Sequence, residues 1–263
     1  MAIPKIIHYC WFGRNPKPKL AEKCLRSWKK FCPDYEIIQW DEDNYDLSQT
    51  PLYVQQAYAE KKWAFVTDYV RLDLVFREGG IYLDTDVELL KPLDSLLSYH
   101  AYFGFERPGF VATGLGFGAE QGAEVIREMM EVYDTLSFRL PDGSFNQTPC
   151  PEYNTPVLQR RGLNLSGDKQ VLPGNILVLS REYLCPMDYE TGECKKTQNT
   201  VSVHWFSASW KSQKEQKEKK SYIRRLKAER FLFTISRLPN KIGMAVFGEN
   251  RYVEIRAFLK GHK

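Results

Sequence analysis

The chain has 263 residues, enough for one large domain, or a domain with an appendage, that buries a full core without disulfides or metals. Its hydrophobic content of 43% and aromatic content of 14% exclude a disordered protein. The net charge is +4 at pH 7, but residues 1–210 carry −6 and residues 211–263 carry +10. We therefore predict an acidic body at 1–210 and a basic, partly amphipathic helical tail at 211–263.

The sequence favours neither a membrane-spanning nor a secreted protein. No apolar run approaches the ~18 residues of a spanning helix, and the first residues lack the apolar stretch of ~7–15 residues found in signal peptides. The spacing of the six cysteines is typical of reduced thiols rather than of disulfides or a zinc site. We expect a cytoplasmic protein whose basic tail could hold it peripherally at the inner face of the cell membrane.

The body alternates short apolar runs with helical patterns, which is typical of an α/β fold. Strands are predicted at residues 6–12, 35–40, 81–83, 101–105, 111–118, 175–179 and 201–206. Helices are predicted from residues 16–19 to at least Trp28, at 53–77 and at 123–133. Residues 137–174 and 181–200 are rich in Pro, Gly and polar residues, and we predict that they form loops over a site.

The triplet Asp84-Thr85-Asp86 directly follows the short strand predicted at 81–83. In an open α/β sheet, ligands bind beyond the carboxyl ends of the strands. The two carboxylates could share one hard cation, and Mg²⁺ or Mn²⁺ held in this way keeps open positions for substrate phosphates. The alternative is a polar strand end or turn, because so short a motif often occurs by chance.

Asp68 and Arg71 are three residues apart and therefore share one face of the helix predicted at 53–77. A Gly-Gly pair ends this helix just before the strand that leads to Asp84. Helix and strand can thus bring the aspartates into one acidic pocket with a single guanidinium, which suits sugar hydroxyls or a carboxylate. The alternative is a local helix ion pair worth a few tenths of a kcal/mol.

Residues 64–71 (Ala-Phe-Val-Thr-Asp-Tyr-Val-Arg) and 79–87 (Gly-Gly-Ile-Tyr-Leu-Asp-Thr-Asp-Val) resemble the sugar-binding Asp-x-Asp region of glycosyltransferase family 32. That family includes yeast-type mannosyltransferases and bacterial capsule and lipopolysaccharide transferases, and it is similar to the glucosyltransferase domain of the large clostridial toxins. Residues 3–13 and 204–210 also look like this family's opening and closing motifs, in the same order. The resemblance implies a GT-A-like domain at 1–210, with a single Rossmann-type sheet and helices on both faces.

The resemblance implies that residues near both ends of the body bind a nucleotide-sugar. Cys10 and Trp11 follow the first strand, and Trp11 would stack on a uracil. The alternative for Trp11 is a position in the core. Ser209 and Trp210 would close over the diphosphate, with the Trp210 indole N–H donating to its bridging oxygen.

The resemblance also implies a metal-dependent centre with four candidate catalytic residues. Asp68 and Arg71 would hold ribose or donor-sugar hydroxyls. Asp84 would contact ribose, sugar and, through water, the metal, whereas Asp86 would ligate Mn²⁺ or Mg²⁺ directly. His204 is a third candidate metal ligand, because related family 8 transferases use a histidine, and the alternative is an ordinary buried histidine.

Three further positions are less directly tied to the centre. Asn154 lies in a polar stretch that the resemblance places near the acceptor, although Asn before Thr-Pro is also typical of a turn. The glycines of residues 113–118 would let a ligand approach closely. His8, within the first strand, is expected in the core.

The resemblance implies a retaining transferase that moves a hexose from a nucleotide-sugar, first of all a UDP-sugar, to a glycan or lipid-linked glycan in bacterial surface polysaccharide synthesis. A metal-dependent phosphohydrolase or nucleotidyltransferase is the main alternative, because it also uses paired aspartates. That alternative leaves Trp11 and the closing Ser209-Trp210 pair without a role. A glycoside hydrolase with two acidic residues is a further alternative, which chelators should not inhibit.

The basic tail leaves two interpretations open. Basic and aromatic residues interleaved at helical spacing can lie on anionic lipid, which would suit a lipid-linked acceptor. The alternative is a packed C-terminal helical cap with a solvated face. A nucleic-acid partner is not expected, because the −6 charge of the body would repel phosphates.

Overall fold

The computed structural model describes residues 2–207, 217–218, 221–226, 228, 242, 248 and 251–255. The chain divides into two compact units, one of Met1–Met187 with Cys194–Trp210 and one of Asp188–Glu193 with Lys211–Lys263. Most of the predicted basic tail lies outside the described residues, and its boundary at residue 210 stays a prediction. Among the helices of the described ranges, none is long and apolar enough to cross a membrane.

The first unit contains an eight-stranded sheet in the order β2-β1-β3-β7-β5-β9-β8, with β6 paired to β5. The strands are β1 (Ile6–Cys10), β2 (Glu36–Trp40), β3 (Gly80–Tyr82), β5 (Ala101–Arg107), β6 (Phe110–Val111), β7 (Phe117–Ala119), β8 (Gln170–Leu172) and β9 (Ile176–Leu179). β1 runs parallel to β2 and β3, β5 runs parallel to β9, and β7 is antiparallel to both β3 and β5. The carboxyl ends of β1, β3 and β5 therefore lie at one edge of this mixed sheet.

A second, two-stranded sheet stands at the same edge. It pairs β4 (Val87–Leu89) with β10 (Ser202–His204) in antiparallel register, with His204 opposite Val87. The turn between β3 and β4 carries Asp84 and Asp86. The sequence analysis did not predict β4, whose three residues are too few for a periodic pattern.

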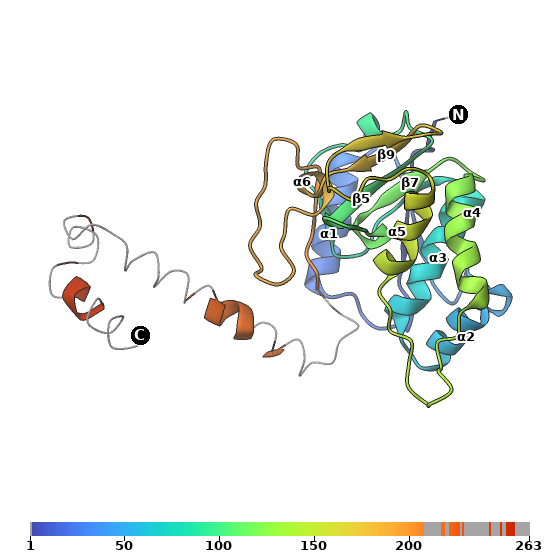
Figure 1. The fold of residues 1–263 in the computed structure, drawn as a ribbon, viewed down its shortest axis with the longest axis horizontal. Helices are drawn as coiled ribbons and strands as arrows, with labels where there is room; N and C mark the ends of the chain where they lie inside the picture. The colour runs from blue at the N-terminus through green and yellow to red at the C-terminus, as the bar shows by residue number, and fades with distance from the viewer. Residues whose placement is uncertain are drawn as a thin grey trace. The chain divides into compact units, whose positions relative to one another are not determined.

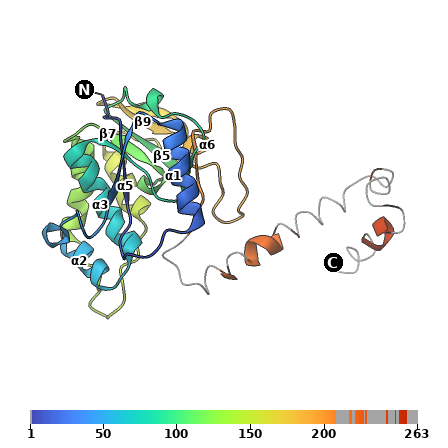
Figure 2. The same cartoon turned by 180° about the vertical axis from the view of Figure 1, so that it is seen from behind.

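Helices cover both faces of the large sheet (Figures 1 and 2). One face buries a core cluster that includes residues of α2 (Leu52–Ala59), α3 (Trp63–Glu78), α4 (Glu124–Glu131) and α5 (Cys150–Arg160). The other face buries a second cluster with residues of α1 (Lys19–Phe31) and α6 (Arg181–Leu184). Short 3₁₀ helices lie at Leu47–Gln49, Asp94–Leu96, Thr113–Leu115 and Val132–Thr135. The predicted α/β fold with helices on both faces is confirmed.

A tight turn from α3 into β3 brings the helix and the Asp-x-Asp strand together. Gly79 and Gly80 have φ angles of 68° and 95°, which side chains disfavour. The Gly79 carbonyl accepts a hydrogen bond from His8 Nε2 at 2.9 Å, and His8 Nδ1 accepts one from the Trp40 indole at 3.1 Å. His8 is fully buried, which confirms the core position predicted for it.

Several predicted elements were wrong in detail. The helix predicted at 53–77 is two helices, α2 and α3, because Lys61 between them has a φ of +56°. The strand predicted at 111–118 is interrupted by the 3₁₀ turn at Thr113–Leu115. The loops predicted at 137–174 and 181–200 contain α5 with β8 and α6, respectively. In α5 a proline stands in the first turn, where it favours a helix start rather than a loop.

Candidate active site

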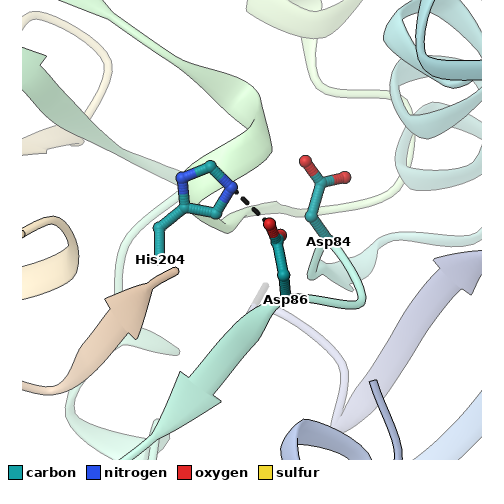
Figure 3. Close-up of side chains that lie close together, drawn as sticks. All are labelled: Asp84, Asp86 and His204. Carbon is teal, nitrogen blue, oxygen red and sulfur yellow. Dashed lines mark ion pairs between the residues drawn. The ribbon is translucent and has the colours of Figure 1, made fainter. Parts of the chain in front are cut away.

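Asp84, Asp86 and His204 come together at the carboxyl edge of the sheet, where β3 ends and β4 pairs with β10 (Figure 3). One candidate ligand atom from each side chain lies within 4.8 Å of the other two. His204 Nε2 is 3.1 Å from Asp86 Oδ1, and both side chains are 13% exposed. This contact therefore joins the turn between β3 and β4 to the end of β10, although the two segments are far apart in the sequence.

Asp86 is held from two sides. Its carboxylate accepts a hydrogen bond from the backbone N–H of Ser207 at 2.7 Å, and its carbonyl accepts one from the N–H of Trp205 at 3.0 Å. Burial alone would raise the pKa of Asp86, but His204 and the Ser207 N–H together hold this pKa below its usual range. Burial would likewise lower the pKa of His204, and the Asp86 carboxylate outweighs it and raises that pKa. Each group of this pair therefore favours the charged form of the other.

Arg71 occupies the centre of the acidic pocket. Its Nη2 lies 3.0 Å from Asp68 Oδ1 and 3.4 Å from Asp84 Oδ1, and its side chain is only 4% exposed. The guanidinium also donates from Nε to the Thr67 carbonyl at 2.9 Å. Asp68 and Arg71 therefore form more than a local helix pair, because the same guanidinium reaches across to the strand end that carries Asp84.

Burial raises the pKa values of two carboxyl groups in this pocket. It raises the pKa of Asp68 to about 6, although Arg71 acts in the opposite direction. Burial also raises the pKa of Asp84, again against the pull of Arg71. A nearby cation would therefore stabilise the ionised form of these carboxylates, and so would hydroxyls of a donor sugar that donate hydrogen bonds to them.

Gly114 is a site residue that the sequence analysis interpreted differently. A Cβ at this position would lie 2.7 Å from Asp84 Oδ2 and 3.0 Å from Arg71 Nη1. The 3₁₀ turn at Thr113–Leu115 thus packs its backbone directly against the Asp84–Arg71 pair. The glycine thus allows two parts of the same chain to pack closely together, whereas the sequence had suggested that it allows a ligand to approach.

The donor atoms fit a divalent cation. Two carboxylates and an imidazole offer ligands that Mn²⁺ accepts, and the carboxylates also suit Mg²⁺. Within the described part of the chain, His204 Nδ1 is buried and has no hydrogen-bond partner. The other ring nitrogen, Nε2, faces Asp86 and is the one that could share a cation with the two aspartates (Figure 3).

The two residues at the end of β1 differ in accessibility. The side chain of Cys10 is buried in the core, so only its backbone could meet a ligand. Trp11 is half-buried, packs against the second core cluster, and donates its indole N–H to the Asn15 carbonyl at 2.6 Å. Trp11 thus packs on the core and keeps exposed surface, and its role in stacking on a base stays a prediction. Ser209 and Trp210 lie outside the described residues.

Asn154 lies on α5 rather than in a loop or turn, and it is fully buried. Its Nδ2 donates to Thr113 Oγ1 at 3.1 Å, and in the described ranges its Oδ1 has no partner. Thr113 also contacts the Cys150 thiol, whose sulfur lies 4.0 Å from Arg71 Nη1. Asn154 therefore lies behind the Thr113–Leu115 turn. Its hydrogen bond to Thr113 supports the backbone against which Asp84 and Arg71 pack.

Fold and geometry together define an α/β protein with a candidate metal site at the ends of its strands. Residues 18–103 match the protein family described as "Glycosyltransferase sugar-binding region containing DXD motif". This match includes Asp68, Arg71, Asp84 and Asp86 but covers less than half of the chain, so this segment is similar to the sugar-binding region of these glycosyltransferases.

Two curated relatives come from Schizosaccharomyces pombe. Inositol phosphoceramide mannosyltransferase 3 is 32% identical over 120 residues, which make up 44% of this chain and 33% of that protein. Inositol phosphoceramide mannosyltransferase 1 is 26% identical over 129 residues, or 42% of this chain and 39% of that protein. The chain thus spans little more than a third of the length of these relatives.

The solved structure of the PaToxG glycosyltransferase is also similar. It has a TM-score of 0.46 and 20% sequence identity, and the superposition covers 60% of this chain and 69% of that chain.

Proposed function

We propose that this protein transfers a hexose from a nucleotide-sugar to a hydroxyl of a glycan or lipid-linked glycan, with the help of a divalent cation. The observation that carries the proposal is the convergence of Asp84, Asp86 and His204 beside the buried Arg71. A UDP-sugar donor, retention of configuration and a role in bacterial surface polysaccharide synthesis follow from the resemblance to family 32. The S. pombe relatives are named as mannosyltransferases, which supports a hexose as the transferred group.

Each residue of the pocket has its own role in the proposed transfer. Bound Mn²⁺ or Mg²⁺ would supply positive charge beside the departing diphosphate, through Asp84, Asp86 and His204. Arg71 keeps Asp68 and Asp84 oriented toward the donor sugar, and its charge is permanent. The Ser207 N–H fixes the rotamer of Asp86. Because these groups are oriented before substrate arrives, they meet the developing charge without reorganising.

A screen of nucleotide-sugars tests this proposal. We expect one donor, with Mn²⁺, to raise the melting temperature in a thermal-shift assay and to be consumed with release of nucleoside diphosphate. EDTA should abolish both effects. Metal-dependent release of a nucleoside monophosphate or of inorganic phosphate would instead support the phosphohydrolase or nucleotidyltransferase alternative. Turnover that resists EDTA would contradict the metal site.

Trp11→Ala is expected to weaken binding of the nucleoside diphosphate about 5- to 150-fold, because base–aromatic stacking contributes ~1–3 kcal/mol. Trp11→Phe, which keeps a flat ring, should retain most of the affinity. Isothermal calorimetry with UDP and Mn²⁺ measures both variants, and urea unfolding checks that each remains folded. Unchanged affinity in Trp11→Ala would assign the indole to the core alone.

The acceptor and the cellular location remain part of the proposal. A lipid-linked acceptor would bring the protein to the cytoplasmic face of a membrane, where the +10 charge of residues 211–263 could meet anionic lipid. The names of the S. pombe relatives contain a lipid, inositol phosphoceramide, which agrees with a lipid-borne acceptor. The tail itself lies mostly outside the described residues.

A further inference from the structure

Glu106 lies at the catalytic edge of the sheet, in an irregular part of β5. The pairing of β5 with β6 shifts register between Phe105, which opposes Val111, and Arg107, which opposes Phe110. Glu106 is therefore the extra residue of a β-bulge. Bulges occur often beside active sites, where they redirect a side chain that a regular strand would hold in line.

The strand alternation shows which faces of the sheet the residues of β5 before the bulge occupy. Phe103 and Phe105 belong to the first core cluster, whereas Tyr102 belongs to the second. A Cβ on Gly104 would meet Leu184 of α6, on the face of the second cluster. This alternation ends at the bulge, so it fixes the face of Tyr102 and Gly104, and Glu106 stands just beyond them at the carboxyl end of β5.

His204 is the residue of the active site on which the charge of Glu106 acts. α6 contacts both β5 and β10, so β10 stands on the face of the sheet that Gly104 of β5 turns toward α6. The charge of Glu106 contributes to the raised pKa of His204, after burial and the two site aspartates. Glu106 is nevertheless outside the group of ligand atoms that could share one cation.

Glu106 differs from the other carboxylates of this edge in having no assigned partner. Asp68 and Asp84 pair with Arg71, and Asp86 pairs with His204. For Glu106, which is half-buried, the described ranges contain no hydrogen bond or ion pair of its carboxylate. A half-buried carboxylate that the protein leaves unpaired is available to accept hydrogen bonds from a ligand.

The order of the strands separates two sides of the site. In the sheet, β1 with Trp11 lies on one side of β3, and β5 lies on the other side, beyond β7. We propose that Glu106 is a substrate-binding residue on the acceptor side, where its carboxylate accepts a hydrogen bond from a hydroxyl of the sugar acceptor and orients that acceptor beside the Asp84–Asp86–His204 group. This assignment rests on the proposed glycosyl transfer, and it extends the site to a residue outside the segment matched to the family.

The test compares Glu106→Gln with Glu120→Gln in the full-length chain. Glu120 is also half-buried, but it follows β7, which runs antiparallel, so it lies at the opposite edge of the sheet. The probes are the donor identified by the screen, a panel of p-nitrophenyl hexopyranosides as acceptors, and water as the alternative acceptor. Mn²⁺ affinity is measured separately by calorimetry.

We expect Glu106→Gln to lower kcat/KM for the sugar acceptor about 10- to 100-fold, as for loss of a hydrogen bond to a charged group. Donor KM, donor hydrolysis by water and Mn²⁺ affinity should stay near wild type, and Glu120→Gln should change none of them. An unchanged acceptor kcat/KM, or an equal fall in transfer and hydrolysis, would overturn the acceptor role. Absence of donor turnover in the wild-type protein would contradict the proposed function instead.

Discussion

Replacing Asp86 with asparagine is expected to lower metal-dependent turnover about 1,000-fold, with little change in folding. The amide keeps the size of the carboxylate and can still accept the hydrogen bond from the Ser207 N–H. It loses the negative charge that faces His204 at 3.1 Å and that would help hold the cation. Loss of ~4 kcal/mol of transition-state stabilisation corresponds to this fall in rate. Steady-state kinetics and Mn²⁺ calorimetry measure the two effects.

Asp73→Asn is the matched control. Asp73 is similarly little exposed, at 16%, and is also ion-paired, to Arg77 at 3.1 Å, but it lies on α3 away from the cluster. It should lose some stability and keep its turnover. Wild-type turnover in Asp86→Asn, or an equal loss in both variants, would remove Asp86 from the centre of the site.

Replacing Arg71 with methionine is expected to destabilise the metal-free protein by ~3–5 kcal/mol at pH 8. Methionine fills much of the same volume, but it leaves Asp68 and Asp84 as unpaired carboxylates that are only 13% and 25% exposed. Removing one partner of a buried ion pair costs about this much. Urea unfolding in the presence of EDTA measures the loss.

The loss should be smaller at pH 5. Even with Arg71 present, burial raises the pKa of Asp68 to about 6, above its value in the unfolded chain. A carboxyl group whose pKa is raised by folding binds more protons when folded, so its contribution to stability falls as the pH rises through that window. Without Arg71 the pKa values of Asp68 and Asp84 rise further, and low pH neutralises both groups.

Arg77→Met on the same helix provides the comparison. The Arg77 side chain is 47% exposed and pairs with Asp73, so its removal should cost ~0–1 kcal/mol at either pH. A loss for Arg71→Met that matches the control, or that is equal at pH 5 and pH 8, would contradict the description of Arg71 as the central cation of the pocket.

The order of elements around the site could be predicted from local patterns. The short apolar run before Asp84 indicated a strand end, and the three-residue spacing of Asp68 and Arg71 placed them on one helix face. The Gly-Gly pair indicated the turn between the two. These inferences succeeded because each depends on residues close together in the chain, where backbone geometry is set by local sterics.

The residues that pack behind the site could not be predicted in the same way. Asn154 was assigned to a loop because Pro and polar residues surround it, yet α5 buries it against Thr113. Gly114 gave no signal of its partner, since Asp84 and Arg71 approach it from another strand and another helix. Packing across the sheet decides such contacts, and it overrides local propensity.

By itself, the sequence determined the α/β class and the division of charge between residues 1–210 and 211–263, and it predicted the group of Asp68, Arg71, Asp84 and Asp86 as the chemical centre. Only the tertiary structure decided that His204 faces Asp86, because β10 reaches β4 through a pairing of residues more than a hundred positions apart. It also decided that β5 ends in a β-bulge, which places Glu106 at the same edge. Local periodicity encodes the elements, whereas the register between distant strands depends on the burial of both partners at once.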